Sequence, residues 1–266
     1  MRILNCAGPS VEKTQQEERE LGTTNHDEQL SSIARRGFTI VPNVFSNREV
    51  DALVSDLQSA FEENHEKSDS VRARDGGVYA ARNVISLVPI TKQCWRRQPL
   101  LSLLGTVLGA EYGLVRGLYF DKPPDQTWSL PWHRDLTIAV ENNQLKSDQF
   151  HKPTTKAGVP HVEAAREILE QMLTLRIHLD DVVDENGPLL VIPGSHDSGG
   201  KVFPDAEASE PIYACQGDVL AIRPLVSHSS VCSHPNNQRH RRIIHLEFSG
   251  CKRLSDGYKW HDWISA

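Results

Sequence analysis

The second half of the sequence is divided into short apolar segments by residues that favour turns. Segments with the length of a strand occupy residues 173–180, 188–192, 217–222 and 241–248, and Gly187 and Pro193-Gly194 lie between them. Short strands separated by glycine and proline turns are typical of sandwiches and barrels. Helical patterns lie mostly in the first half. The chain is therefore expected to be mainly β, a jelly roll or barrel supported by helices.

The first half predicts the supporting helices. Residues 37–42 form a short apolar segment that ends at a proline, which indicates a first strand. Ser46 and Glu49 have the spacing of a capping box at the start of a helix. Residues 100–108 predict a second, very apolar helix. The first helix has one apolar stripe, which consists of Val50, Leu53, Val54, Leu57 and Phe61.

Length and composition favour one globular domain. The chain has 266 residues, of which 38% are apolar. Residues 1–28 are polar and are expected to form a mobile tail, which leaves 29–266 as a single domain. The net charge of -6 comes from interspersed acidic and basic residues, which argues against nucleic acid as a partner. No apolar run approaches the length of a membrane span, so no membrane association is expected.

The cysteines and the N-terminus favour a cytoplasmic location. Residues 1–10 lack the apolar core of a secretory signal. No Cys-x-x-Cys pair is present, so a cysteine-bound zinc site is not expected. An odd number of scattered cysteines instead fits free thiols in a reducing compartment. They are Cys6, Cys94, Cys215, Cys232 and Cys251.

The candidate site begins in the segment Pro131-Trp132-His133-Arg134-Asp135. Residues 128–135 are predicted to form a strand, and side chains two residues apart project from the same face of a strand. His133 and Asp135 would then lie side by side. A distant histidine would complete a set of two imidazoles and one carboxylate. Such a set holds a divalent metal on one face and leaves its other positions open.

Three histidines compete for the distant position. His228 comes soonest after the predicted strand 217–222, His234 precedes a turn-forming Pro-Asn-Asn, and His240 lies further along. We favour His228. Imidazole nitrogens with a carboxylate oxygen suit iron(II), whereas thiolates would have favoured zinc or an iron–sulfur cluster. The alternative interpretation is that His133 and Asp135 form a hydrogen bond at the surface. The histidine and the arginine found further along the chain argue against this alternative.

Five segments carry a family resemblance. They are Lys122-Pro123-Pro124, Pro131-Trp132-His133-Arg134-Asp135, Leu179-Asp180-Asp181, Glu185-Asn186-Gly187-Pro188-Leu189 and Pro193-Gly194-Ser195-His196. Together they resemble the phytanoyl-CoA dioxygenase family of iron(II)/2-oxoglutarate oxygenases, over residues 37–248. The resemblance implies a double-stranded β-helix, iron(II) bound by His133, Asp135 and His228, and 2-oxoglutarate as cosubstrate. Ascorbate is expected to support activity in vitro.

The family also implies an arginine that binds the C5 carboxylate of 2-oxoglutarate. The spacing from the distal histidine is slightly longer here than in better-known members, so Arg239, Arg241 and Arg242 compete for this role. Strand alternation favours Arg241, because its inward orientation would leave the apolar residues Ile244, Leu246 and Phe248 to pack outward beneath helices. The planar fork of an arginine binds both oxygens of a carboxylate.

Other polar residues have two possible roles each. Lys122 would contact 2-oxoglutarate or an anionic substrate, or it would be a surface lysine on a turn. Arg176 shares a strand face with His178, and this face points either to the barrel interior, where Arg176 would touch substrate or 2-oxoglutarate, or to solvent. Arg82 and His161 also remain open between a structural and a substrate-facing role, and His196 is expected to be structural.

Residues 141–160 are polar and have no strand or helix periodicity. A segment of this length in a compact domain is usually a lid or a binding loop, and we expect a lid over the metal. Residues 161–172 predict a helix.

The sequence thus predicts an iron(II)- and 2-oxoglutarate-dependent dioxygenase. It would hydroxylate an unactivated C–H of a small organic substrate, with dioxygen as the other reactant, and release succinate and carbon dioxide. The alternative is a non-catalytic metal- or 2-oxoglutarate-binding protein, which the complete ligand set argues against. Asp135 argues against a halogenase, because related halogenases lack this carboxylate. Nothing in the sequence identifies the substrate, a CoA site or the oligomeric state.

Overall fold

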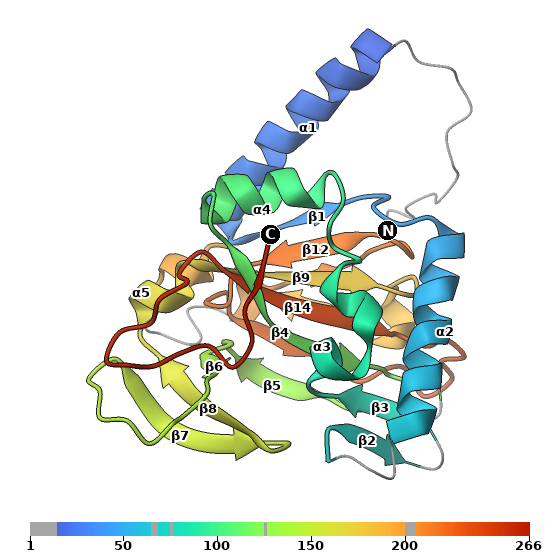
Figure 1. The fold of residues 1–266 in the computed structure, drawn as a ribbon. Coiled ribbons are helices and arrows are strands. Elements are labelled where there is room, and N and C mark those ends of the chain that lie inside the picture. The colour runs from blue at the N-terminus through green and yellow to red at the C-terminus, as the bar shows by residue number, and fades with distance from the viewer. Residues whose placement is uncertain (1–14, 65–68, 75–76, 125–126, 200–205) are drawn as a thin grey trace.

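The computed structural model describes residues 15–64, 69–74, 77–124, 127–199 and 206–266. Its strands form a large sheet and a small sheet that face each other, and a third sheet lies at one end (Figure 1). The large sheet has the order β1 (Phe38–Val41), β12 (Val219–Ile222), β9 (Met172–His178), β14 (Ile243–Ser249), β4 (Gly113–Phe120), β3 (Gly77–Ala81) and β2 (Val71–Arg74), and β15 (Ile264–Ser265) also pairs with β4.

The small sheet provides the second wall of the molecule. Its order is β11 (Glu210–Ile212), β10 (Leu189–Val191), β13 (His228–Ser230) and β5 (Leu130–His133). The third sheet contains β6 (Thr137–Ala139), β8 (Val159–Ala164) and β7 (Phe150–Lys156). All strand pairs in the described residues are antiparallel, and the three sheets do not join into one closed barrel.

Helices cover the outer face of the large sheet (Figure 1). They are α2 (Asn47–Asn64), α3 (Val84–Leu87) and α4 (Leu100–Leu108). The predicted capping box of α2 is confirmed, since the Ser46 amide donates to the Glu49 carboxylate at 2.8 Å and the Glu49 amide donates back to the Ser46 hydroxyl at 3.4 Å. Of the predicted stripe, Val50, Leu53, Leu57 and Phe61 are buried in the main core.

Alternation along β9 and β14 separates an apolar face from a polar one. Leu175 and Ile177 of β9 and Leu246 of β14 join the core beneath the helices. Arg176 and His245 come from the opposite face of the same strands and are cross-strand neighbours. Burial of the apolar face against helices thus forces the polar residues toward the space between the two sheets.

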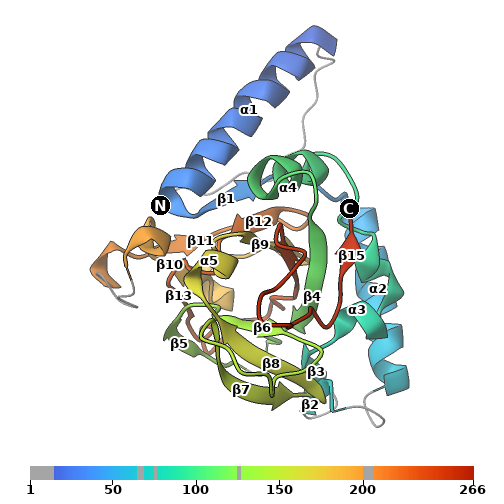
Figure 2. The same ribbon diagram turned by 60° about the vertical axis from the view of Figure 1, so that its left-hand side comes forward.

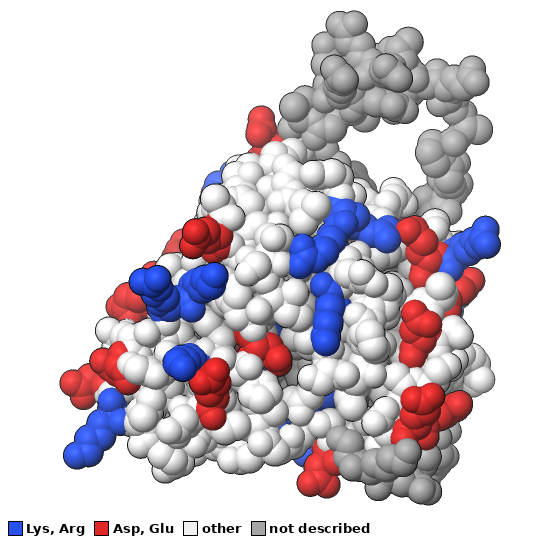
Figure 3. All heavy atoms as spheres, in the orientation of Figure 1, with Lys and Arg blue, Asp and Glu red and all other residues white. Residues whose placement is uncertain are grey.

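These facing antiparallel sheets form the double-stranded β-helix that the sequence predicts, a jelly roll with supporting helices (Figure 2). The predicted strands at 37–42, 188–192 and 217–222 correspond to β1, β10 and β12, and the predicted helix at 100–108 is α4. On the face shown in Figure 3, acidic side chains follow α2 and elsewhere both signs are interspersed.

The segment after the candidate site differs from the prediction. Residues 141–160 are not one irregular loop, because they contain β7 and the start of β8, which pair as a hairpin. The predicted helix at 161–172 is also wrong, since β8 continues to Ala164 and only the short α5 (Arg166–Leu169) follows. Most of β7 is exposed and polar, so it gives no apolar alternation from which a strand could be predicted.

The N-terminal region contains one long helix, and one cysteine differs from the prediction. Helix α1 (Gln15–Arg36) continues past the predicted tail boundary at residue 28 and projects from the body, while Ile33 near its end enters the core (Figure 1). Residues 1–14 of the predicted tail, and with them Cys6, lie outside the described residues. Cys215 is disulfide-bonded, so the prediction of free thiols is wrong at that position. It holds for Cys94, Cys232 and Cys251.

Among the described residues, no helix combines the length and the apolar character needed to cross a bilayer.

Candidate metal and cosubstrate site

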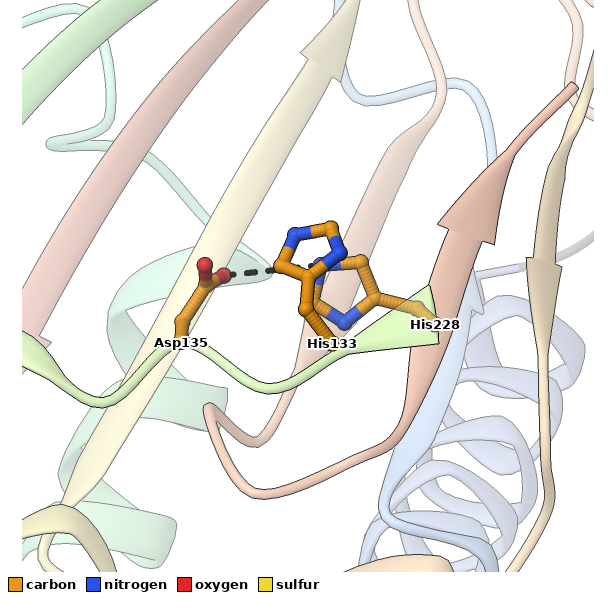
Figure 4. A group of neighbouring side chains, drawn as sticks. All are labelled: His133, Asp135 and His228. Carbon is orange, nitrogen blue, oxygen red and sulfur yellow. Dashed lines mark ion pairs between the residues drawn. The ribbon is translucent and has the colours of Figure 1, made fainter. Parts of the chain in front are cut away.

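Two neighbouring strands of the small sheet bring the predicted histidines together. His133 is the last residue of β5 and His228 is the first of β13, and the two are cross-strand partners. Their ring centroids are 4.3 Å apart (Figure 4). The rival histidines lie elsewhere: His234 is exposed, and His240 pairs with Asp121 at 2.9 Å. The structure thus brings His228 to His133, and not the other two.

Asp135 reaches the histidines from just beyond the strand. The predicted strand 128–135 is too long, because β5 ends at His133 and the Asp135 amide donates to the Pro224 carbonyl, in the segment before β13, at 3.0 Å. The Asp135 carboxylate lies 3.7 Å from Nε2 of His228 (Figure 4). One potential ligand atom from each of His133, Asp135 and His228 lies within 4.8 Å of the others.

Backbone carbonyls set the proton positions of both histidines. Nδ1 of His133 donates to the Pro131 carbonyl at 2.7 Å, and Nδ1 of His228 donates to the Val226 carbonyl at 2.9 Å. A carbonyl can only accept, so in each ring Nδ1 carries the proton and Nε2 keeps its lone pair. Metal-binding histidines are oriented in this way by a partner on the other ring nitrogen.

The ionisation states also fit a divalent metal. Burial lowers the pKa of His228 to about 4, so the ring is neutral at pH 7. Burial alone would raise the pKa of Asp135, but His228, His245 and His133 outweigh it and bring this pKa to about 2. Two imidazoles and one carboxylate on one side of a pocket are a donor set suited to iron(II), with room for further ligands. These residues therefore fit the ion that the family implies.

The three residues lie in a cavity between the two sheets, which we call the metal pocket. Its apolar wall includes Phe120, Trp128, Leu130 and Leu189, and its polar wall includes Arg176, Ser230, Arg241 and His245. Arg176 and Arg241 are both buried. Burial lowers the pKa of each guanidinium, yet both stay charged at pH 7. The metal pocket therefore contains fixed positive charge beside the three potential metal ligands.

Arg241 lies deep in the metal pocket and has unused hydrogen-bonding capacity. Its two terminal nitrogens donate to the Gly187 carbonyl at 2.8 Å and to the Ser230 hydroxyl at 3.2 Å. Nε of Arg241 and Nε of Arg176 have no hydrogen-bond partner among the residues that the structure describes. Buried donors without partners are costly, so an anionic ligand would complete this wall.

Lys122 approaches the same wall from the end of β4. It is fully buried, and its ammonium donates to the Ser230 hydroxyl at 2.9 Å and to the Val231 carbonyl. It also lies 4.9 Å from the centre of the Trp128 ring. Burial, with the nearby Arg241 second, lowers the pKa of Lys122 to about 7. The interpretation of Lys122 as a surface lysine is therefore wrong.

The competing arginines point away. Arg242 binds the Asp180 carboxylate with Nε at 2.9 Å and Nη2 at 2.6 Å, on the side of β14 away from the metal pocket. Arg239 is exposed and lies beside Asp181 and Gln216 in a separate surface depression. Strand alternation thus predicted the orientation of the Arg241 side chain correctly. Arg176 is buried, so the alternative interpretation, in which its strand face points to solvent, is wrong.

One buried network behind the metal pocket was missed. Arg116 of β4 donates through Nε to Glu247 of β14 at 2.9 Å, and Nε2 of His245 lies 3.1 Å from the same carboxylate oxygen. Burial raises the pKa of Glu247, but Arg116 and His245 outweigh it and lower this pKa overall. The strand register sets Arg116 opposite Glu247. No local spacing in the sequence shows that pairing.

The remaining polar residues have mixed positions. His178 is buried, and burial, with Arg176 second, lowers its pKa to about 3. His161 is buried on β8, where Nδ1 donates to the Val159 carbonyl at 2.9 Å. Nε2 of His196 lies 3.3 Å from the Ala34 carbonyl, in agreement with a structural role. Arg82 lines a second cavity beside the metal pocket.

Comparison with curated proteins gives partial matches. The chain is 27% identical over 173 residues to an ectoine dioxygenase from Bordetella parapertussis, which covers 64% of this chain and 49% of the relative. It is 26% identical over 173 residues to an ectoine dioxygenase from Bordetella bronchiseptica, with the same coverage. The chain thus spans about half the length of these relatives.

Solved structures share the fold over most of the chain. EctD from S. alaskensis, crystallised with 2-oxoglutarate and 5-hydroxyectoine, superposes with a TM-score of 0.63 at 17% identity and covers 84% of this chain and 75% of that one. AviO1 from Streptomyces viridochromogenes gives a TM-score of 0.59 at 20% identity, with 87% and 97% covered. At these sequence identities, the structural similarity supports the assignment of this chain to the jelly-roll fold.

A family model supports the resemblance seen in the motifs. The model described as phytanoyl-CoA dioxygenase (PhyH) matches residues 33–243, which include all of the segments that carry the resemblance. This match extends over well more than half of the chain, and so the chain belongs to the phytanoyl-CoA dioxygenase family.

Proposed function

We propose that the chain is an iron(II)- and 2-oxoglutarate-dependent dioxygenase that hydroxylates an unactivated C–H of a small organic substrate. The observation that carries the proposal is the metal pocket, in which His133, Asp135 and His228 converge beside buried cations. Related proteins agree with it: EctD has been crystallised with bound Fe and with 2-oxoglutarate. Succinate and carbon dioxide would be the coproducts.

Each wall of the metal pocket has its own role in this proposal. Nε2 of His133, Nε2 of His228 and the Asp135 carboxylate would hold iron(II). Bound there with 2-oxoglutarate, the iron would supply the activation of dioxygen. Arg241 and Lys122 would bind the C5 carboxylate of 2-oxoglutarate, and Ser230, which accepts from both, fixes their positions. Arg176 would contact the cosubstrate or the substrate from β9.

The apolar wall would position the substrate and exclude water. Phe120 and Trp128 are aromatic neighbours with ring centroids 6.2 Å apart, and Leu130 lies with them at the edge of the metal pocket. A low-polarity wall strengthens the interactions of the charged groups opposite it and limits side reactions with water. The hairpin β7–β8 follows His133 and Asp135 in sequence, and we propose that it acts as a lid.

The test is succinate formation from 2-oxoglutarate in the presence of iron(II), ascorbate and dioxygen. Small organic compounds, with ectoine among the first, would be screened for stimulation of succinate release, and mass spectrometry would detect a product that has gained one oxygen. Asp135→Ala is the matched control and should lose all stimulated turnover. If metal and 2-oxoglutarate bind normally but no succinate forms with any compound, the non-catalytic binding protein becomes the better description.

A further inference from the structure

A second cavity adjoins the metal pocket, and basic residues line it. Its volume is about 180 Å³, and it shares Phe120, Trp128 and Leu130 with the metal pocket. Its far side is formed by Arg72 of β2, Tyr79 of β3 and Arg82, which directly follows β3. A ligand that occupied both spaces would have its apolar part along the shared aromatic wall and its far end beside the arginines.

Arg82 is half-buried at this far end and has no acidic partner within ion-pair distance among the described residues. The nearby carboxylate of Glu247 is already bound by Arg116 and His245. In addition, Nη1 of Arg116 is buried and has no hydrogen-bond partner in the described part of the chain. This side of the site therefore has more positive charge than its own carboxylates neutralise.

The hairpin β7–β8 adds a further cation to Arg72, Arg82 and Arg116. Lys156 at the end of β7 donates to the Thr137 hydroxyl at 3.0 Å, and Thr137 lies only two residues after Asp135 in the sequence. The side-chain amide of Asn83 donates to the Ala157 carbonyl at 3.2 Å. Asn83 directly follows Arg82 in the sequence, and Ala157 directly follows Lys156. This hydrogen bond joins the residue after Arg82 to the residue after Lys156, and so links the end of β3 to the turn of the hairpin.

The charges influence one another as expected for such a cluster. Burial lowers the pKa of Arg82, and Arg116 and Arg72 lower it further. Burial also lowers the pKa of Lys156, with Arg116 and Arg82 next. Burial lowers the pKa of His161 to about 4, so this neighbour is neutral at pH 7 and adds no charge. Cations held together in a partly desolvated site are stabilised by a bound anion.

From this arrangement we infer that the substrate is an organic anion whose carboxylate or phosphate group is bound between Arg82 and Lys156. Its carbon skeleton would lie along Phe120, Trp128 and Leu130, which directs a C–H toward the metal ligands. The inference rests on the proposed function, because it assigns the substrate class of the same site.

The test uses protein saturated with manganese(II) and 2-oxoglutarate, and three simple probes. They are 3-phenylpropionate, its uncharged amide 3-phenylpropionamide, and phenyl phosphate. Broadening of the probe signals in NMR by the bound manganese reports both affinity and proximity to the metal. We expect the better of the two anions to bind at least about tenfold more tightly than the amide, a difference of about 1.4 kcal/mol. The preferred anion distinguishes a carboxylic acid from a phosphate ester as the natural substrate.

Variants locate the preference. Arg82→Gln and Lys156→Gln should each reduce the anion's advantage over the amide, while Arg82→Lys should keep most of it. Lys152→Gln is the matched control, because Lys152 lies on the same hairpin but is exposed and pairs with Glu163. Equal affinity for acid and amide in the wild type, or an unchanged preference in both Gln variants, would overturn the inference.

A preliminary measurement separates this inference from the proposed function. If manganese and 2-oxoglutarate together fail to stabilise the wild type, the proposed function fails and the substrate assignment with it. If they do stabilise it and the amide still binds as well as the acid, only the substrate assignment fails.

Discussion

His133 and His228 are cross-strand partners at the paired ends of β5 and β13, with ring centroids 4.3 Å apart. The ladder between two strands of the small sheet therefore sets the separation of the two imidazoles. Asp135 is positioned differently, by the hydrogen bond of its amide to the Pro224 carbonyl. Two segments far apart in the sequence must both be folded before the three potential ligands meet.

The first prediction concerns metal-dependent binding of 2-oxoglutarate. For a ligand at about 100 times its Kd, the gain in folding stability is about 2.7 kcal/mol. In a protein of this size that raises Tm by roughly 5–10 °C. We expect this rise with manganese(II) and 2-oxoglutarate together and little with 2-oxoglutarate alone, because the chelate at the metal provides part of the binding. His228→Ala should abolish the joint effect in a thermal scan.

Two histidine variants are controls for that experiment. His234→Ala should match the wild type, since His234 is exposed. His240→Ala should lower the starting Tm, because it removes the partner of Asp121, but should keep the joint rise. A joint rise that survives in His228→Ala would show that another residue completes the metal site.

The second prediction separates two adjacent arginines. Arg241→Ala should weaken 2-oxoglutarate binding by roughly 2–5 kcal/mol, because it removes one partner of a desolvated charge pair. Manganese binding should change little. Arg242→Ala should instead lower the free energy of unfolding by about 1 kcal/mol, through loss of the partly exposed pair with Asp180, and should leave 2-oxoglutarate binding intact. Calorimetric titration of both variants measures this, and the reverse result would contradict the assignment.

The third prediction is a pH dependence due to Lys122. Burial, with Arg241 second, lowers its pKa to about 7. A carboxylate bound beside it favours the ammonium and raises this pKa. Below pH 7 the ammonium is already present, whereas above pH 7 binding must take up a proton. The Kd of 2-oxoglutarate for the metal-loaded protein should therefore rise with pH, by up to about tenfold per pH unit.

Lys122→Met is the variant that tests this cause. It should bind 2-oxoglutarate more weakly at pH 7, and its Kd should be nearly constant between pH 7 and pH 9. Titrations in buffers of different ionisation enthalpy would show proton uptake in the wild type only. The same slope in both proteins would assign the proton to another group.

The fourth prediction concerns the β7–β8 hairpin. Its contacts to the body of the site include the hydrogen bond from Lys156 to Thr137. If the hairpin closes over the metal, tryptic cleavage at Lys146 and Lys156 should slow severalfold when manganese, 2-oxoglutarate and the better anionic probe are all present. Cleavage at the C-terminal Lys252 serves as the internal control. Equal cleavage rates at the hairpin with and without ligands would show that it does not act as a lid.

Periodicity explains which parts of the fold were predictable. Strands with an apolar face or a continuous apolar run, such as β9, β12 and β14, were recognisable from the sequence, and α2 shows its stripe and its capping box. The same alternation, extended back from β14, identified Arg241 over Arg242, which lie just before this strand. Hairpin β7–β8 escaped prediction because β7 has an exposed, polar strand surface, and β5 was predicted too long because its ladder ends at His133.

Long-range side-chain pairs were the part of the site that the sequence could not provide. Arg116 and Glu247 are 131 residues apart, and only the register of β4 with β14 sets them opposite each other. A hydrogen bond from the Asn83 side chain to the Ala157 carbonyl likewise joins the residue after Arg82 to the hairpin. Neither arrangement has a local sequence pattern, since each depends on how distant strands pair.

The two carbonyls that hold the histidine protons belong to the main chain at Pro131 and Val226. Every amino acid has such a carbonyl, so substitutions at these two positions leave the acceptor in place. The hydrogen-bonded network of Arg116, Glu247 and His245 has no such protection. Each of its members is a side chain, so a single amino-acid substitution interrupts it. During evolution the imidazole orientation can therefore outlast extensive divergence of the surrounding sequence, while the buried charge network behind it persists only as long as all three of its side chains do.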